Sequence, residues 1–171
     1  MRIRELVLEV VRPLLPRAAR PLAEGSSLSG EFLSLAERAL SGSVGSRVIR
    51  ALSDPGVVRE LSELDSATLV VDLLGRNPEL LYVHQYGSPP EYLLKRLETS
   101  PIEPREFPEL ASSVASALRL VSELHPRAKI RLLLVAPTAL AFLAGALLGP
   151  SEVTLLQLSG GRYVEISARR A

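Results

Sequence analysis

One uncharged apolar stretch, from Leu132 to Pro150, constrains the fold of this 171-residue chain more than any other feature. About 18 or more uncharged apolar residues can span a bilayer as a helix, so the stretch must first be tested as a membrane segment. Pro137 divides it into the end of Ile130–Val135, which has the length of a buried strand, and Ala139–Leu148, which has helical length. A continuously apolar strand followed at once by a helix is the unit of an α/β sheet covered on both faces. The pattern therefore favours a soluble, cytoplasmic α/β domain, and no membrane partner is expected.

Composition disfavours several classes of function. The formal net charge is +1, aromatic residues make up 4% of the chain and tryptophan is absent, which argues against binding to duplex or bulk single-stranded nucleic acid. There is no cysteine, and two histidines cannot form a zinc site unaided, so neither a metal nor another cofactor is expected. The sequence has no Ser/His/Asp set, paired carboxylates, P-loop or GxGxxG motif. A binding protein is therefore favoured over an enzyme, and no catalytic residue is assigned.

Residues 1–64 are predicted to form a helical N-terminal region. Apolar residues recur at helical spacing from Ile3 to Val11, and Ser29 is a candidate N-cap for a second helix. Shorter helices are expected over Gly45–Leu52 and after Asp54–Pro55. Residues 65–171 are predicted to form the α/β unit, a Rossmann-like mixed sheet with its helices.

From Thr68 onward the hydrophobic period changes to that of strands. Thr68–Leu74 and Glu79–His84 are predicted to pair as an antiparallel hairpin, because the loop 75–78 between them is too short for a parallel crossover. The elements expected after this hairpin are a short helix, a long helix, a βαβ unit and a closing hairpin strand: Glu91–Glu98, Leu110–Leu124, Ile130–Val135 with Ala139–Leu148 and Val153–Leu158, and Tyr163–Ser167.

This connectivity predicts where a ligand would bind. Ligands of open α/β sheets bind beyond the carboxyl ends of parallel strands, which here are expected at 85–88, 136–138 and 159–162. The hairpin loop is expected at the opposite edge, which demotes Arg76 and Asn77. The candidate ligand-binding residues are Gln85, Tyr86, Gly87, Ser88, Ala136, Pro137, Thr138 and Arg162.

Each of these candidates also has a purely structural interpretation. The N–H groups that follow Ala136-Pro137 could face a phosphate at a helix N-terminus, or Pro137 could simply start the helix and Thr138 cap it. Tyr86 could stack on a base or serve as a core tyrosine with an exposed hydroxyl. Arg162 could clamp a phosphate or lie unengaged beside its Gly-Gly turn. Both interpretations remain open for all of these residues.

The segment Ala117–Ile166 resembles the C-terminal part of SAVED domains, which are nucleotide-sensing modules related to the CARF domains of prokaryotic antiviral systems, CRISPR and CBASS among them. The likeness lies in the strand that ends in Ala136-Pro137, in the small-residue helix from Ala139 to Gly145, and in the strand Val153–Leu158. The resemblance implies that the chain binds a cyclic oligonucleotide and switches on an effector. At the level of residues it extends to Ala136, Pro137 and Thr138.

The chain departs from SAVED domains in size. Those domains usually comprise two Rossmann-like halves, whereas this chain has room for one such half plus helices, and it shows no fused nuclease, protease or TIR effector. The resemblance thus implies a sensor subunit that forms homo-oligomers and receives its effector, or a second sensor half, in trans. Two alternatives remain open: a nucleotide phosphodiesterase of the ring-nuclease type, with Ser88, Thr138 or Arg162 at the scissile phosphate, and a non-catalytic interaction or scaffold subunit of a larger complex.

Overall fold

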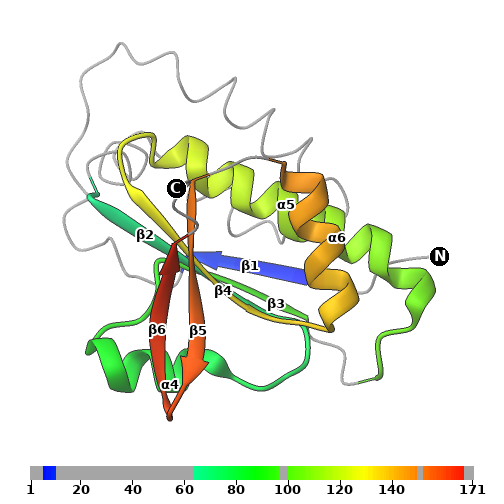
Figure 1. Cartoon of the computed structure of the whole chain (residues 1–171), viewed down its shortest axis with the longest axis horizontal. Coiled ribbons are helices and arrows are strands. Elements are labelled where there is room, and N and C mark those ends of the chain that lie inside the picture. Colours follow the sequence, from blue (N-terminus) through cyan, green and yellow to red (C-terminus); the bar gives the residue numbers. More distant parts are fainter. Residues whose placement is uncertain (1–5, 11–63, 97–99, 150–151, 168–171) are drawn as a thin grey trace.

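A computed structural model describes residues 6–10, 64–96, 100–149 and 152–167 of the chain. These residues form a six-stranded mixed sheet with the strand order β1-β3-β2-β4-β5-β6 (Figure 1). The strands are β1 (Leu6–Val10), β2 (Ser66–Asp72), β3 (Tyr92–Arg96), β4 (Lys129–Val135), β5 (Val153–Ser159) and β6 (Arg162–Ser167). The strands β3, β2, β4 and β5 are parallel to one another, whereas β1 and β6 are antiparallel edge strands. The predicted α/β class with a mixed sheet is confirmed.

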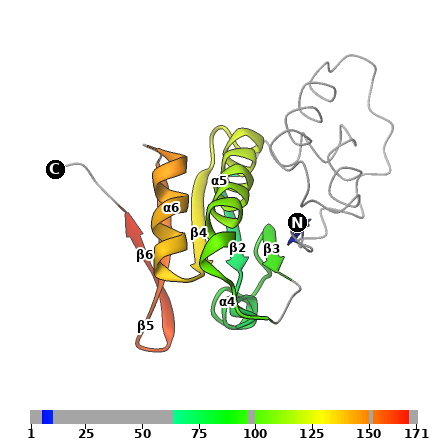
Figure 2. The ribbon, with the colours of Figure 1, turned by 90° about the vertical axis from the view of Figure 1, so that its right-hand side faces the viewer.

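Helices cover both faces of this sheet. In the described part of the chain they are α4 (Pro78–Tyr86), α5 (Phe107–Leu124) and α6 (Thr138–Leu148), with a 3-10 turn at Pro104–Glu106 before α5. Buried residues of α5 and α6 pack with Leu69 and Val71 of β2, whereas Tyr82 of α4 packs with Val70 from the other face of that strand. Figures 1 and 2 show this arrangement, with α5 and α6 on one side of the sheet and α4 on the other.

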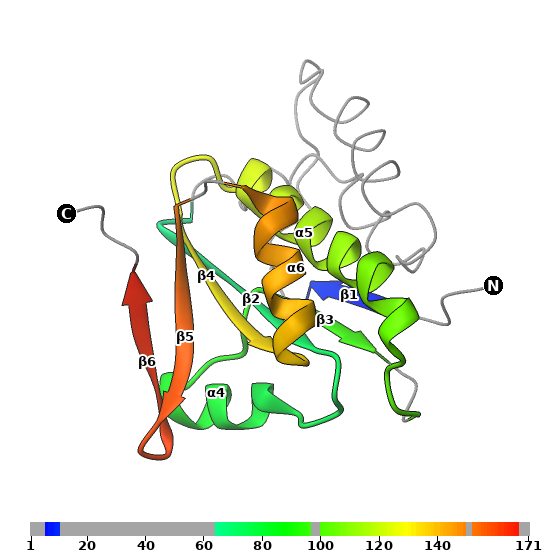
Figure 3. The same ribbon diagram turned by 45° about the vertical axis from the view of Figure 1, so that its right-hand side comes forward.

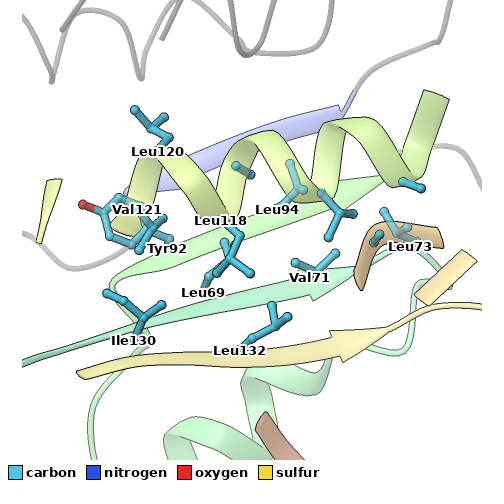
Figure 4. Close-up of a cluster of buried hydrophobic side chains, with 14 of the residues drawn as sticks. Leu69, Val71, Leu73, Tyr92, Leu94, Leu118, Leu120, Val121, Ile130 and Leu132 are labelled. Atoms are coloured by element: carbon cyan, nitrogen blue, oxygen red, sulfur yellow. The ribbon is translucent and has the colours of Figure 1, made fainter. Parts of the chain in front are cut away.

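The larger core lies between α5 and the centre of the sheet. Figure 4 shows Leu69, Val71, Leu94 and Leu132 pointing toward Leu118 of α5. All six residues of β2 from Ala67 to Asp72 are buried, because helices lie against both of its faces. Such two-sided burial explains why the sequence of β2 is almost continuously apolar and does not alternate.

The long apolar stretch forms β4 and α6, as predicted. Both elements match the expected ranges within one residue, and the strand β5 that follows is parallel to β4, so the expected βαβ unit is confirmed. The Gly-Gly turn and the last strand also form as expected, because Gly160 and Gly161 both take the positive φ angles that a tight hairpin turn favours. Among the described residues, no helix combines the length and hydrophobicity that a transmembrane segment requires.

Two of the predicted elements are wrong between β2 and α5. Residues 79–84, expected as a strand, lie in the helix α4, and residues 92–96, expected within a helix, form the strand β3. The antiparallel hairpin does not exist, because α4 is the crossover that connects β2 to the parallel strand β3. The apolar sequence of residues 79–84 fits either structure, and the helix prevails because Tyr82 and Pro78 bury against the sheet.

The predicted N-terminal helix over Ile3–Val11 is also wrong where the structure describes it. Leu6–Val10 is the edge strand β1, which pairs antiparallel with β3 from Leu6 opposite Arg96 to Val10 opposite Tyr92. Hydrogen bonding to an existing sheet overrides the weak helical period of this five-residue segment. The other helices predicted before residue 64 lie outside the described residues.

Tyr92 couples the stability of this core to alkaline pH. Its hydroxyl is hydrogen-bonded to Nε2 of the buried His125 at 2.8 Å, and burial, reinforced by the charge of Glu91, raises the pKa of Tyr92 far above its ordinary value of 10.0. Because the folded-state pKa is the higher one, this stabilisation is complete below about pH 10 and is lost as the pH rises further.

We expect the free energy of unfolding to fall above pH 10 by about 1.4 kcal/mol per pH unit for Tyr92 alone. Urea unfolding at pH 9, 10 and 11 measures this slope. The Tyr92→Phe variant should show a slope smaller by that amount, and equal slopes in the two proteins would contradict the assignment.

Candidate functional site

The strongest candidate for a binding site is the point at which the connections of the sheet change direction. From β2 the chain crosses through α4 to β3 on one side, whereas from its neighbour β4 the chain crosses through α6 to β5 on the other side. The two helices lie on opposite faces, so the loops that leave β2 and β4 diverge from each other. Open α/β sheets bind ligands outside the carboxyl ends of the strands at such a switch point, and we call this place, between the loops 73–77 and 136–138, the crevice. Figure 3 shows β2 and β4 ending together next to the start of α6.

Asp72 organises the first of the two loops, which runs from Leu73 to Asn77. Its buried carboxylate accepts the backbone N–H groups of Leu74 at 3.2 Å, Arg76 at 3.0 Å and Asn77 at 2.9 Å. Three N–H groups that converge on one carboxylate turn the chain sharply, and Gly75 and Asn77 accordingly have φ angles of 66° and 49°. Asn77 then precedes Pro78, which begins α4. The loop therefore has a defined shape that one side chain imposes.

The second loop, Ala136–Thr138, connects β4 to α6. Leu73 N–H donates to the carbonyl of Val135 at 3.0 Å, so the two loops leave the sheet side by side. Pro137 occupies the N-cap position of α6, Thr138 is the first helical residue, and no side chain caps the helix. The structural alternative in which Thr138 caps the helix is therefore wrong. The first N–H groups of α6 have no acceptor within the helix, and its first turn contains no acidic residue, so this end can accept an anion.

The charges around the crevice come mainly from the loop and from β3. Arg76 is exposed at the tip of the first loop. Lys95 of β3 donates to the Asn77 side-chain oxygen and to Oε1 of Glu79 at 3.0 Å, which ties β3 to the start of α4. No group of three or more histidine, aspartate or glutamate residues that could hold a metal ion occurs in the ranges that the structure describes.

Tyr163 of β6 contacts the start of α4, directly after the first loop. Its hydroxyl donates to the carbonyl of Pro78 at 3.2 Å. Burial raises the pKa of Tyr163 above its ordinary value, and the negative charges of Glu79 and Asp72 raise it further, so the phenol stays protonated over a wider alkaline range. Sequence reasoning did not find this contact, because it joins residues far apart in the chain.

The structure does not place Gln85–Ser88 at the carboxyl end of a strand, where they were expected. These residues end α4 and begin the loop that leads to the amino end of β3. The side-chain amide of Gln85 pairs with the outer edge of β6, donating to the carbonyl of Tyr163 at 2.8 Å and accepting its N–H at 2.6 Å. Gly87 is the left-handed C-cap of α4. A ligand contact by Gln85–Ser88 stays a prediction, but a place at the carboxyl end of a strand no longer supports it.

Tyr86 lies in a cluster around a partly buried arginine that the sequence did not reveal. The Arg131 guanidinium lies 5.4 Å from the centre of the Tyr86 ring, and it donates to the hydroxyl of Tyr82 at 3.1 Å. The same hydroxyl is 3.0 Å from that of Thr68, and Glu165 lies 3.7 Å from Arg131. This arrangement favours the interpretation of Tyr86 as a structural tyrosine, since one face of its ring already contacts a cation.

Arg162 lies on the β5–β6 hairpin and apart from the crevice. Arg162 is exposed, and it pairs with Ser159 next to the hairpin turn. Because β5 pairs with β4 only from Val153 to Leu155, the rest of the hairpin diverges from β4. Figures 1 and 3 show its tip pointing away from the start of α6. The predicted site residues thus lie in two separate places. Ala136–Thr138 lie at the crevice, whereas Gln85 and Arg162 lie at the β5–β6 hairpin, where Gln85 pairs with Tyr163.

The edge of the sheet predicted for Arg76 and Asn77, on which their demotion rests, is wrong. They were expected at the opposite edge because the segment after them was interpreted as a strand. The structure places both residues at the carboxyl edge, beside the crevice. The available signal was an Asn-Pro-Glu start with Gly87 nine residues after Pro78, which is typical of a short helix.

Comparison with known proteins identifies a similar fold. No family model matches the sequence, and no curated protein matches it. The structure is similar to that of the Acinetobacter baumannii Cap4 SAVED/CARF-domain containing receptor, solved with the cyclic trinucleotide 2'3'3'-cAAA, with a TM-score of 0.50 and 19% sequence identity. The match covers 60% of this chain and 24% of the receptor, so the matched part of this chain corresponds to about a quarter of that protein. At this identity the likeness shows the fold alone, and it confirms the SAVED/CARF-like fold that the Ala136-Pro137 motif implied.

Proposed function

We propose that this chain is a sensor subunit that binds a cyclic oligonucleotide in the crevice between the loops 73–77 and 136–138. The observation that carries the proposal is the switch point, which sets a carboxylate-held loop beside an uncapped helix N-terminus. The fold gives independent support, because the similar receptor was solved with a cyclic trinucleotide. In this proposal the crevice holds one phosphate of the ring.

The chemistry of the crevice suits a phosphate. The backbone N–H groups of Thr138 and Ala139 belong to the first turn of α6, where the helix dipole favours negative charge. Arg76 is exposed on the facing loop and makes no ion pair with any described residue, so its guanidinium is available for a bidentate contact. The fixed shape of the Asp72-held loop lowers the entropy lost when Arg76 engages a ligand.

The size of the chain determines the rest of the proposal. Because the match spans about a quarter of the receptor's length, we propose that a neighbouring subunit completes the enclosure of the ligand. The complex would form homo-oligomers in the cytoplasm and control an effector supplied in trans, in antiviral defence of the CRISPR or CBASS type. Binding would then report the presence of a nucleotide signal, and oligomerisation would transmit it.

Calorimetry with the full chain tests the proposal. A panel of cyclic di-, tri- and tetranucleotides should include one ligand with a dissociation constant of roughly 1 µM or lower. A folded protein that is silent across the whole panel would overturn the proposed function. Release of a linear product during the titration would instead favour a phosphodiesterase.

Thr138→Asp should separate binding from folding. A carboxylate at the start of α6 occupies the place of the phosphate, so affinity should fall about fivefold or more. The fold should remain stable, because aspartate in the first turn interacts favourably with the helix dipole. Ser112→Asp is the matched control, since it adds the same charge at an exposed position of α5. Unchanged affinity in folded Thr138→Asp would remove the start of α6 from the site.

Arg76→Ala tests the facing loop in the same titration. Loss of a charge-assisted contact with phosphate should weaken binding about tenfold. Arg127→Ala is its control, because Arg127 is an exposed arginine just before the amino end of β4, at the opposite edge of the sheet. Equal effects of the two variants would show that Arg76 contributes only general charge.

A further inference from the structure

The outer surface of α6 is unusually apolar for a helix that is mostly exposed. Its 11 residues include no charged side chain, and only Leu140 and Ala144 are buried. Phe142 is 76% exposed and Leu147 is 46% exposed. Helices that are apolar all round are normally covered, and exposed apolar patches commonly mark interaction sites.

The neighbouring hairpin extends this apolar surface. Leu155 of β5 and Ile166 of β6 are paired across the hairpin and are 47% and 48% exposed. Both lie on the face of the sheet that carries α6, because Leu156, the neighbour of Leu155, packs on the α4 side. We call the exposed residues Phe142, Leu147, Leu155 and Ile166 the α6 surface.

A cavity opens beside the α6 surface, which contributes Leu155 to its lining. It has a volume of about 390 Å³ and is lined mainly by apolar groups of α5, α6, β4 and β5, among them Ala141, Gly145, Leu134 and Leu155. This volume lies in the range of pockets that hold ligand groups, about 300 to 1,000 Å³. The pairing of β5 with β4 ends at Leu155, so these two strands separate next to the cavity.

A second copy of this chain is the occupant that fits the α6 surface. An isologous interface requires one patch to complement itself, and here an exposed aromatic side chain and an apolar cavity lie on the same helix, at Phe142 and beside Ala141. The helix has no charge that would be repelled when the patch faces its own copy. Aromatic anchors that enter apolar pockets are the usual energetic centres of interfaces.

We infer that two copies of the chain associate through the α6 surface, with Phe142 of each copy seated in the cavity of the other. An 11-residue helix is about 16 Å long, so the interface belongs to the smaller class, below about 1,200 Å² in total, that forms reversible complexes. The proposed function includes oligomerisation, and this inference rests on it only in that respect, by naming the surface through which two copies associate. Its test requires no nucleotide.

Sedimentation equilibrium of the full chain, from roughly 1 to 300 µM, measures this association. The apparent mass should rise from 18.5 kDa toward twice that value. Phe142→Glu should raise the dissociation constant at least tenfold. Leu80→Glu, at a residue that is 69% exposed on α4, is the matched control and should leave it unchanged.

Gly145→Leu provides a second test that does not add charge. A side chain at Gly145 meets no atom within 4 Å, so leucine can fill the cavity while improving the helix propensity. The filled cavity should weaken association without loss of stability. A wild-type chain that stays monomeric over the whole range would overturn the inference and leave the α6 surface to another polypeptide. A monomer that binds nucleotide contradicts only this inference, whereas a dimer that binds none contradicts only the proposed function.

Discussion

Asp72→Ala should lower the free energy of unfolding by about 3 kcal/mol, because it removes three charge-assisted hydrogen bonds at the base of the crevice. Each such bond contributes about 1.5 to 3 kcal/mol, and water should replace part of this for N–H groups at the exposed rim of the loop. Without the carboxylate, the N–H of Asn77 loses the acceptor that helps to hold this residue at its positive φ angle. Ligand affinity should therefore fall together with stability.

Urea unfolding of Asp72→Ala and Asp65→Ala measures this effect. Asp65 lies just before β2 and is exposed, so its replacement should change the free energy of unfolding by less than about 0.5 kcal/mol. A loss below about 1 kcal/mol in Asp72→Ala would contradict the role of this carboxylate. It would mean that the loop keeps its shape by other contacts.

Leu140→Ala should lower the free energy of unfolding by about 2 to 5 kcal/mol, the range found for fully buried leucines. Leu140 is 0% exposed and belongs to the core cluster below α6. Its loss would leave a void in this core, and the cost depends on how far the surrounding side chains can relax into it. Leu143→Ala, on the same helix at 37% exposure, should cost about 1 kcal/mol.

Thermal and urea unfolding of the two variants decides whether α6 packs on the sheet as described. A cost for Leu143→Ala equal to that for Leu140→Ala would mean that the helix is rotated about its axis. It would also undermine the α6 surface, because Phe142 would then lie elsewhere.

The fold from β4 to β6 could be predicted because its signals are local. The stretch after Arg131 is too apolar for anything but a buried strand and a helix, Pro137 marks the boundary, and Gly160-Gly161 specifies the turn. The long helix α5 was also predictable, since its buried residues recur at helical spacing. These elements place Ala136–Thr138 at the crevice without any knowledge of long-range contacts.

The error at residues 79–84 moved half of the predicted site to the wrong place. Leucine, tyrosine and valine in a short run satisfy both strand and helix patterns, and the decision depends on burial against β2 and β4. With residues 79–84 predicted as a strand, Arg76 and Asn77 are expected at the amino edge of the sheet and Gln85–Ser88 at the carboxyl edge. The structure has the reverse arrangement. The Asn-Pro-Glu start and the glycine at position 87 are the local signals that favour the helix.

Other features of the site depend on contacts between distant segments. The pairing of Gln85 with Tyr163 and the contact of Arg131 with Tyr82 each join separate elements. No spacing rule indicates them, because they depend on how α4 crosses the sheet. The role of Asp72 is different, since all of its partners lie within five residues and an aspartate before a Gly-containing turn is typical of such caps.

Amide NMR of the labelled chain, titrated with the cyclic oligonucleotide that calorimetry selects, tests the central claim most directly. We predict that the largest shifts occur at Leu74 and Arg76 of the first loop and at Thr138 and Ala139 of α6, because these N–H groups border the proposed phosphate position. Shifts confined to α4 and the β5–β6 hairpin, with both crevice loops unchanged, would contradict the claim and place the ligand beside Gln85 and Arg162.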